Sequence, residues 1–165
     1  MALNLDGKKA VVEEVAQYAA KAHSAVVAEY RGLTVTELTE LRKTARETGV
    51  YLRVVKNTLA KRAVVGTEFE CMQTALIGPL IIAFSMEDPG SAARLISDFA
   101  KTHDKLITKI VAIGGTAFDG SELARLARLP TRDQGISMLM SVMKAPVEKL
   151  VRTLAAVKDQ MQEAA

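Results

Sequence analysis

The strongest pattern of apolar and polar positions in the chain lies in residues 131–165. When each residue is turned by about 100° on a helix, many apolar side chains fall within one arc of roughly 120°. The start of this helix is indicated by Thr131 and Gln134, which have the spacing of a capping box. Since Pro146 removes a backbone hydrogen bond, we expect two helical segments with a kink or short break between them. The apolar stripe has ten members: Ile136, Leu139, Met140, Met143, Val147, Leu150, Val151, Leu154, Val157 and Met161.

An amphipathic helix more often packs against its own domain than against another chain. A helix of this length, however, would extend about 45 Å at 1.5 Å per residue, which is further than a small domain is wide. Its apolar side chains, at roughly 1.5–3 kcal/mol each when fully buried, form too much surface to leave in water. We therefore predict that the stripe is a binding site for other chains.

The preceding residues alternate between helical periodicity and short apolar runs. Thr34 and Glu37 form a capping box, and Asn57 is expected to cap a further helix. Helices are predicted over residues 6–22, 34–49, 57–66, 68–75, 88–99 and 119–129, and strands over residues 24–30, 50–55, 76–84 and 106–113. This alternation predicts an α/β fold in which helices cover a small sheet of about four strands, followed by a long protruding C-terminal helix. The expected domains are residues 1–130 and 131–165.

The amino-acid composition is sufficient for a packed core, and the basic and acidic residues are unevenly distributed along the chain. In a chain of 165 residues, 49% apolar and 25% charged positions suit one packed domain with an extension. Residues 30–66 contain eight basic and three acidic residues, whereas residues 67–104 contain two basic and six acidic ones. A basic half beside an acidic half suggests a polyanionic partner on one side only.

The single cysteine, Cys71, excludes an internal disulfide and suits a reducing compartment. The longest apolar run, residues 76–84, is too short to span a bilayer, so we expect a cytoplasmic protein without a membrane partner. The sequence has no glycine-rich phosphate loop, no paired Cys or His spacing and no constellation around a general base. No catalytic residue, cofactor or metal is therefore expected. An enzyme acting on a small acidic substrate is a remote alternative.

Basic residues are concentrated around the second predicted strand and the helix that follows it. Residues 50–66 contain no acidic side chain. Free N–H groups at the start of a helix suit a phosphate, so RNA binding through shape and phosphate contacts is expected, and a solvated basic face is the alternative. The candidate RNA-binding residues are Arg31, Gly32, Arg42, Arg46, Arg53, Lys56, Asn57, Thr58, Lys61 and Arg62.

The run that begins at Tyr30, Y-R-G-L-T-V-T-E-L-T-E-L-R-K-T-A-R-E-T-G-V, continues as Y-L-R-V-V-K-N-T-L-A-K-R-A. It resembles the family of the bacterial large-subunit ribosomal protein ten, the stalk-base proteins. Three further stretches resemble the same family: G-P-L-I-I-A-F-S from Gly78, P-G-S-A-A-R-L from Pro89 and K-L-V-R-T-L-A-A-V-K-D from Lys149. The resemblance covers essentially the whole chain.

This resemblance implies a protein bound to the ribosome in the cytoplasm. The N-terminal domain would bind 23S rRNA beside ribosomal protein eleven, and the C-terminal helix would carry dimers of the acidic stalk protein, which recruit translational GTPases. The family also commonly represses translation of its own messenger RNA. Arg31-Gly32, Arg42, Arg46 and residues 56–58 match the basic RNA-facing motif of the family, and the apolar stripe matches its dimer-binding segment.

Pro146 and Gly135 are departures from a regular dimer-binding helix, and they affect the angle and rigidity of its segments. Because the expected kink divides the stripe in two, we predict two dimers rather than three. The remaining alternative is a non-ribosomal RNA-binding protein that forms a homo-oligomer through its C-terminal helix.

Overall fold

The computed structural model describes residues 4–103 and 105–163. The chain divides into two compact units, with the boundary between Leu129 and Pro130. The α/β fold class and the long C-terminal helix are confirmed. Along unit 1 the elements are α1 (Leu5–Lys21), β1 (Ser24–Glu29), α2 (Val35–Glu47), β2 (Val50–Val54), α3 (Asn57–Val64), η1 (Glu70–Ala75), β3 (Leu80–Ser85), α4 (Ser91–Thr102), β4 (Ile107–Ile113), β5 (Thr116–Asp119), η2 (Gly120–Glu122) and α5 (Leu123–Ala127).

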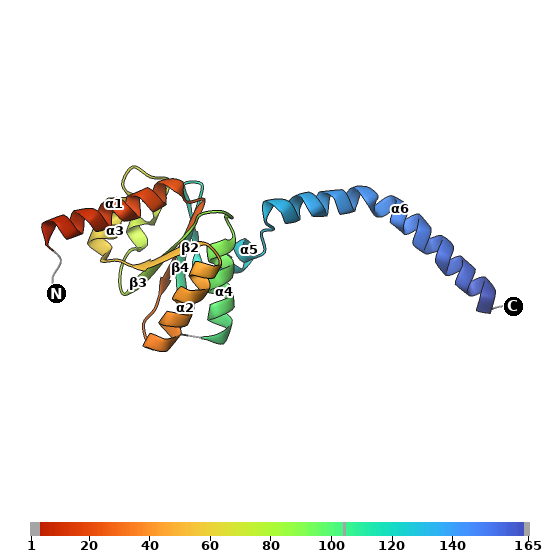
Figure 1. Cartoon of the computed structure of the whole chain (residues 1–165), viewed down its shortest axis with the longest axis horizontal. Coiled ribbons are helices and arrows are strands. Elements are labelled where there is room, and N and C mark those ends of the chain that lie inside the picture. Colours follow the sequence, from red (N-terminus) through yellow and green to blue (C-terminus); the bar gives the residue numbers. More distant parts are fainter. Residues whose placement is uncertain (1–3, 104, 164–165) are drawn as a thin grey trace. The chain divides into compact units, whose positions relative to one another are not determined.

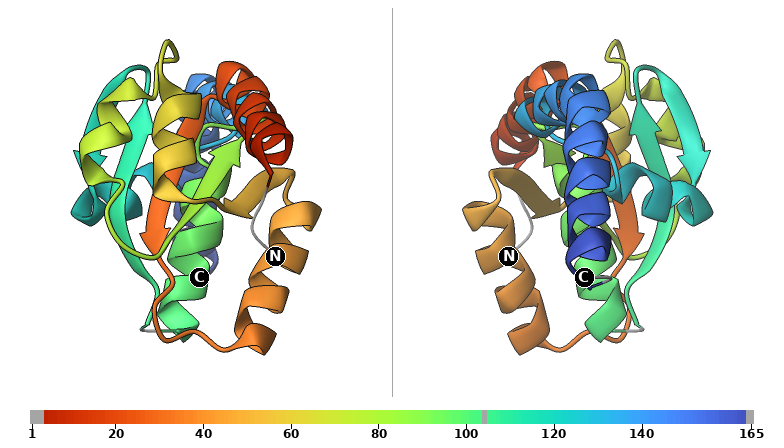
Figure 2. Two further views of the ribbon diagram at one scale, coloured as in Figure 1. Left: turned by 90° about the vertical axis from the view of Figure 1, so that its left-hand side faces the viewer. Right: turned by 90° about the vertical axis from the view of Figure 1, so that its right-hand side faces the viewer.

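The sheet has five strands in the order β2-β3-β1-β4-β5, and all neighbouring strands are antiparallel. Figure 2 shows β2 and β5 at opposite edges. The estimate of about four strands missed β5, which the chain reaches through Gly114 and Gly115, both with positive φ. All four residues of β5 are exposed, and its two apolar residues, Ala117 and Phe118, are adjacent, so the strand shows no alternation of apolar and polar positions. The helix expected from residue 119 begins only at Leu123.

The two faces of the sheet are covered by different helices. Alternate strand residues point to opposite faces. Ala25 and Val27 of β1 pack in the cluster formed with α1, α3 and η1, whereas Val26 and Ala28 pack with α2, α4 and α5. Both faces of β1 are therefore buried, which explains why the sequence of this central strand is a nearly continuous apolar run.

Several helix starts differ from the sequence-based expectation. Asp88 and Pro89 do not open α4, which begins at Ser91 after Gly90; the buried Ser85 hydroxyl accepts a hydrogen bond of 3.0 Å from Ala92 N–H. Asp6 lies inside the first turn of α1 rather than at its cap. The acceptor for the first turn of α4 thus comes from the preceding strand, β3, and not from a residue at the helix start, where a cap signal is sought. By contrast, the capping box of Thr34 and Glu37 is present as predicted.

Unit 2 consists of α6, Arg132–Glu163. Its predicted capping box is confirmed: Thr131 N–H donates to Gln134 Oε1 at 3.1 Å, and Gln134 N–H donates to Thr131 Oγ1 at 3.3 Å. The helix continues through Pro146 without a break, and Figure 1 shows its axis changing direction near the middle. None of the helices within residues 4–103 and 105–163 combines the length and apolar character needed to cross a membrane.

Candidate nucleic-acid interface and chain-binding helix

Four strand ends meet at one end of the sheet. Glu29, the last residue of β1, pairs with Leu80 at the start of β3 and with Ile107 at the start of β4. Val54, the last residue of β2, pairs with Ile81 of β3. The loops that follow β1 and β2 therefore lie beside those that precede β3 and β4. We call this region the sheet end.

The sheet end brings together basic residues that are far apart in the sequence. A shallow hollow of about 410 Å³ is lined by Tyr30, residues 54–58 and residues 78–80. Exposed Arg31 and Gly32 directly follow Tyr30. Gly32 has a φ of 90°, and a Cβ placed there would lie 3.5 Å from Cδ of Lys105. Arg31, Lys56 and Lys105 therefore lie on loops at the same end of the sheet.

The start of α3 contributes backbone donors to this surface. Leu59 and Ala60 N–H both donate to the carbonyl of Lys56, at 2.8 and 3.0 Å. In the first turn this leaves the N–H groups of Asn57 and Thr58 available to an anion. Asn57 is not the cap that the sequence suggested: Lys56 occupies that position, and Asn57 Nδ2 donates to Gly78 O at 2.9 Å. The Asn57 side chain thus ties α3 to the loop before β3.

Two lysines near the start of β4 were missed by sequence reasoning. Lys105 is exposed and lies against Gly32. Lys109 Nζ lies 3.0 Å from Glu29 Oε2 and 3.3 Å from Ile77 O, so its charge is balanced locally. Only the pairing of β1 with β4 brings these lysines to the sheet end, and no local pattern could have indicated it. We define the sheet-end group as Arg31, Gly32, Lys56, Asn57, Thr58 and Lys105. Lys61 and Arg62 follow in the next turn of α3.

The other three candidate arginines lie elsewhere. Arg42, Arg46 and Arg53 line a hollow of about 530 Å³ along β2, together with Glu14 of α1. Arg53 forms an ion pair with Glu14. Tyr51 OH donates to Glu14 Oε1 at 2.9 Å, and Arg53 Nη1 donates to Tyr51 OH at 3.1 Å. The charge of Arg53 is therefore already engaged within unit 1.

This cluster shifts three ionisation equilibria. Hydrogen bonds from Arg53 and Tyr51 lower the pKa of Glu14, because they stabilise its carboxylate. Burial raises the pKa of Tyr51, and hydrogen bonds to Tyr51 and Glu14 raise the pKa of Arg53. The Tyr51 ring also stacks on Tyr18, with centroids 3.8 Å apart, so Tyr51 has a structural role in unit 1.

A pH dependence of stability follows from Glu14. Because its folded-state pKa lies below its unfolded value near 4.5, its contribution is present above that value and is lost as the pH falls through the lower folded pKa. Replacing Glu14 by Gln should lower the urea midpoint at pH 7 and leave a smaller loss of stability on acidification. Glu13→Gln, at an exposed position, is the control and should keep the wild-type acid dependence. Identical acid profiles for wild type and Glu14→Gln would contradict this account.

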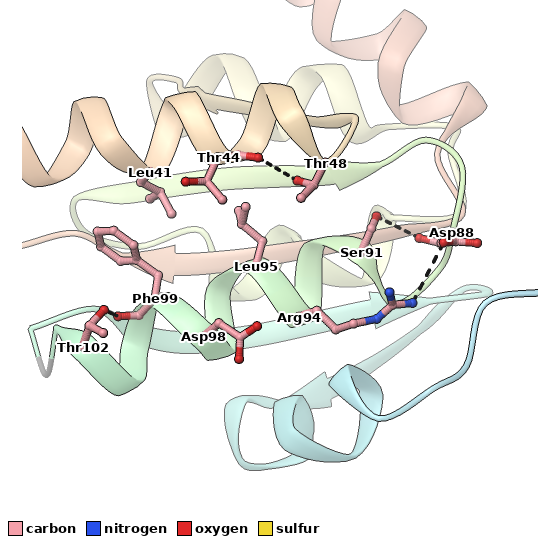
Figure 3. A pocket seen from close by; sticks show the side chains of 10 residues that line it. All are labelled: Leu41, Thr44, Thr48, Asp88, Ser91, Arg94, Leu95, Asp98, Phe99 and Thr102. Atoms are coloured by element: carbon pink, nitrogen blue, oxygen red, sulfur yellow. Dashed lines mark hydrogen bonds and ion pairs between the residues drawn. The ribbon is translucent and has the colours of Figure 1, made fainter. Parts of the chain in front are cut away.

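A third hollow, of about 560 Å³, lies between α2 and α4 (Figure 3). Leu41, Leu95 and Phe99 form its apolar part. Arg94 lies 4.0 Å from Asp88 and donates to Leu129 O at 3.3 Å. The hydroxyl groups that line the hollow, those of Thr44, Thr48, Ser91 and Thr102, donate to backbone carbonyls of their own segments. This hollow has no nucleophile with an adjacent base. Across the described residues, no group of three His, Cys, Asp or Glu could hold a metal ion.

The apolar stripe of α6 is exposed along its whole length. Relative exposure runs from 48% at Ile136 to 73% at Met143. Met138 and Val142, outside the predicted arc, are also 57% and 68% exposed. The first half of α6 is therefore apolar on two sides. The helical-wheel argument missed this second side because it selected only the arc that continues through the second half.

Comparisons with known proteins agree with the resemblance. Residues 3–101 match the family described as "Ribosomal protein L10", and residues 129–164 match "Ribosomal protein uL10 C-terminal region". The chain is 67% identical to the large ribosomal subunit protein uL10 of Methylococcus capsulatus, over 99% of this chain and all of that protein. It is 61% identical to the uL10 of Thioalkalivibrio sulfidiphilus over the full length of both. The chain therefore belongs to the ribosomal protein L10 family, whose members are structural, non-enzymatic components of the large ribosomal subunit.

Proposed function

We propose that this chain forms the base of the ribosomal stalk, with unit 1 bound to 23S rRNA and α6 carrying dimers of the acidic stalk protein. Family membership makes it a structural protein of the ribosome in the cytoplasm. The observation that carries the proposal is the uncovered stripe of ten apolar side chains on α6. We expect other chains to cover this surface, because exposed apolar patches of this size are rare on soluble proteins.

The RNA-binding part of the proposal is supported by the sheet-end group. Arg31, Lys56 and Lys105 supply three exposed cations on loops at the sheet end, and the first turn of α3 adds backbone N–H groups there. Helix starts and lysine or arginine side chains both bind phosphate oxygens, and such contacts position a protein on folded RNA. The proposed interface is narrower than the sequence suggested. It contains the sheet-end group with Lys61 and Arg62, and it leaves the three arginines beside β2 as a separate surface.

Charge reversal tests this interface. The triple variant Arg31→Glu, Lys56→Glu, Lys105→Glu should bind a 23S rRNA fragment from the GTPase-associated region on the order of 100-fold more weakly, because each contact releases counterions. The slope of log affinity against log salt should fall by about 2–3. Titrations at several KCl concentrations give both values. Lys21→Glu, Arg125→Glu, Arg128→Glu makes the same change of charge at other exposed positions and should retain most of the affinity. Equal losses for the two triple variants would contradict a localised interface.

The stalk-carrying part of the proposal is supported by the length and period of the stripe. An amphipathic helix that lays its apolar face in a groove is a common mode of peptide recognition. The direction change of α6 divides the stripe into two parts, Ile136–Met143 and Val147–Met161. We therefore propose one acidic dimer on each part. Recruitment of translational GTPases, contact with ribosomal protein eleven and repression of the chain's own messenger RNA are proposed from the family resemblance.

Native mass spectrometry of the full chain with the acidic stalk protein tests the stoichiometry. We expect one copy of this chain with two dimers, and truncation after Ala145 should leave one dimer. A truncated chain that still binds two dimers would show that the parts are assigned wrongly.

Light scattering of the purified chain alone distinguishes the stalk-base function from the alternative, a homo-oligomer assembled through α6. A defined oligomer whose size is unaffected by the acidic stalk protein would favour the homo-oligomer. Poor solubility or an irregular state, relieved when the acidic protein is added, would favour the stalk-base function.

A further inference from the structure

We propose that the free edge of β2 is a docking site for an extended acidic segment of another protein, which adds to the sheet as a sixth strand. The proposal is independent of RNA binding at the sheet end and of dimer binding on α6. It rests on three observations: the unpaired backbone of β2, the different chemistry of the two walls beside it, and the spacing of Arg42 and Arg46.

The backbone of β2 is available on one side. β2 is the outermost strand of the sheet and pairs with β3 alone. Apart from that ladder, no backbone hydrogen bond joins residues 50–54 to any residue within the described ranges. A row of unpaired N–H and C=O groups on an outer strand is a template for another strand. The hollow of about 530 Å³ along Val50–Arg53 leaves room beside this edge.

The two walls of the hollow differ because α1 and α2 cover opposite faces of the sheet. On the α1 side, the guanidinium of Arg53 is paired with Glu14 and bonded to Tyr51, so this wall is close to neutral. On the α2 side, Arg42 and Arg46 are exposed, and neither has a carboxylate within 4.0 Å among the residues that the structure describes. One wall is thus cationic and the other neutral.

An extended peptide matches this asymmetry. Successive side chains of a strand point to opposite faces, so one set would face α2 and the other α1. Arg42 and Arg46 are four residues apart on α2, about 6 Å along its axis. Side chains two residues apart in a strand are separated by about 6.6–6.8 Å. Two acidic residues in the pattern acidic-x-acidic could therefore each meet one arginine, with polar or apolar side chains between them facing Tyr51.

The same surface suits RNA less well. Half of the available backbone groups are carbonyl oxygens, which repel phosphate and can accept hydrogen bonds from RNA only at ribose hydroxyls and bases. The Glu14 carboxylate lies in the same hollow. A peptide strand supplies both donors and acceptors along the edge. Charged side chains often protect sheet edges from pairing, but the guanidinium of Arg53 is engaged by Glu14 of α1.

The test uses full-length ¹⁵N-labelled protein and a short peptide in which glutamate alternates with valine. Amide hydrogen exchange, read by NMR, should slow at alternate residues of Val50–Val54 by about 10-fold or more when the peptide binds. A peptide with lysine in place of glutamate, and one with proline at its centre, should give no protection. The double variant Arg42→Glu, Arg46→Glu should lose the effect, whereas Arg125→Glu, Arg128→Glu should keep it. Unchanged exchange in β1 and β3 shows that each variant is folded.

Two results would overturn the proposal. The first is binding of the glutamate peptide without protection of β2 amides, which would indicate charge attraction alone. The second is a duplex RNA that shifts the signals of Arg42 and Arg46 where the peptide does not, which would assign this edge to RNA. Because the triple variant at the sheet end leaves Arg42 and Arg46 intact, it should bind the peptide normally whether or not it binds rRNA.

Discussion

Aspartate in place of Leu150 and Leu154 is expected to remove one acidic stalk dimer from the complex. Both side chains lie in the stripe on the second part of α6 and are 61% and 62% exposed in the chain alone. Burying a leucine side chain contributes roughly 1.5–3 kcal/mol, and the new carboxylates would have to enter an apolar groove. Affinity for the second dimer should therefore fall by about 100-fold to 10,000-fold. Native mass spectrometry should then show one dimer per chain.

The matched control places aspartates on the other side of the same part of α6. Arg152→Asp, Ala156→Asp has the same spacing and a similar helix propensity cost. It also breaks the Arg152–Glu148 ion pair of 3.5 Å, which is highly exposed and contributes little. This control should bind two dimers. If both double variants lose a dimer, helix stability rather than the stripe is responsible, and if neither does, the stripe is not the binding surface.

Local signals explain most of what the sequence predicted correctly. A capping box involves residues three apart, so Thr34–Glu37 and Thr131–Gln134 could be read directly and were confirmed. The apolar stripe is likewise a property of one continuous helix. Central strands such as β1 are buried on both faces and appear as apolar runs. In each case the residues that define the feature are close in sequence.

What the sequence could not show depends on pairing between distant segments. Lys105 reaches Gly32 only because β4 pairs with β1. Arg53 of β2 was counted as an RNA-binding candidate because its partner Glu14 lies far away in the sequence, on α1. The edge strand β5 has exposed residues on both faces and so lacks a hydrophobic pattern. The assignments of RNA-binding and dimer-binding residues stay predictions.

A core substitution should separate the two proposed functions. Phe84 of β3 is 1% exposed and packs against Phe69 and Tyr51, with ring centroids 5.8 and 6.3 Å away. Phe84→Ala should lower the free energy of unfolding of unit 1 by about 3–5 kcal/mol, because it removes a buried ring and leaves a cavity. Since folded domains have only about 5–15 kcal/mol of stability, the urea midpoint should fall sharply. Phe118→Ala on β5, where the ring is 39% exposed, is the control and should cost far less.

The functional consequence follows from the division into two units. At a urea concentration between the midpoints of Phe84→Ala and wild type, unit 1 of the variant is unfolded and rRNA binding should be lost. All ten stripe residues belong to unit 2, so both acidic dimers should remain bound, as in wild type under the same conditions. Loss of the dimers from the variant alone would mean that α6 depends on folded unit 1 to bind them. Retention of rRNA affinity would mean that the sheet-end group does not form the RNA interface, because its strands and loops meet only in the folded sheet.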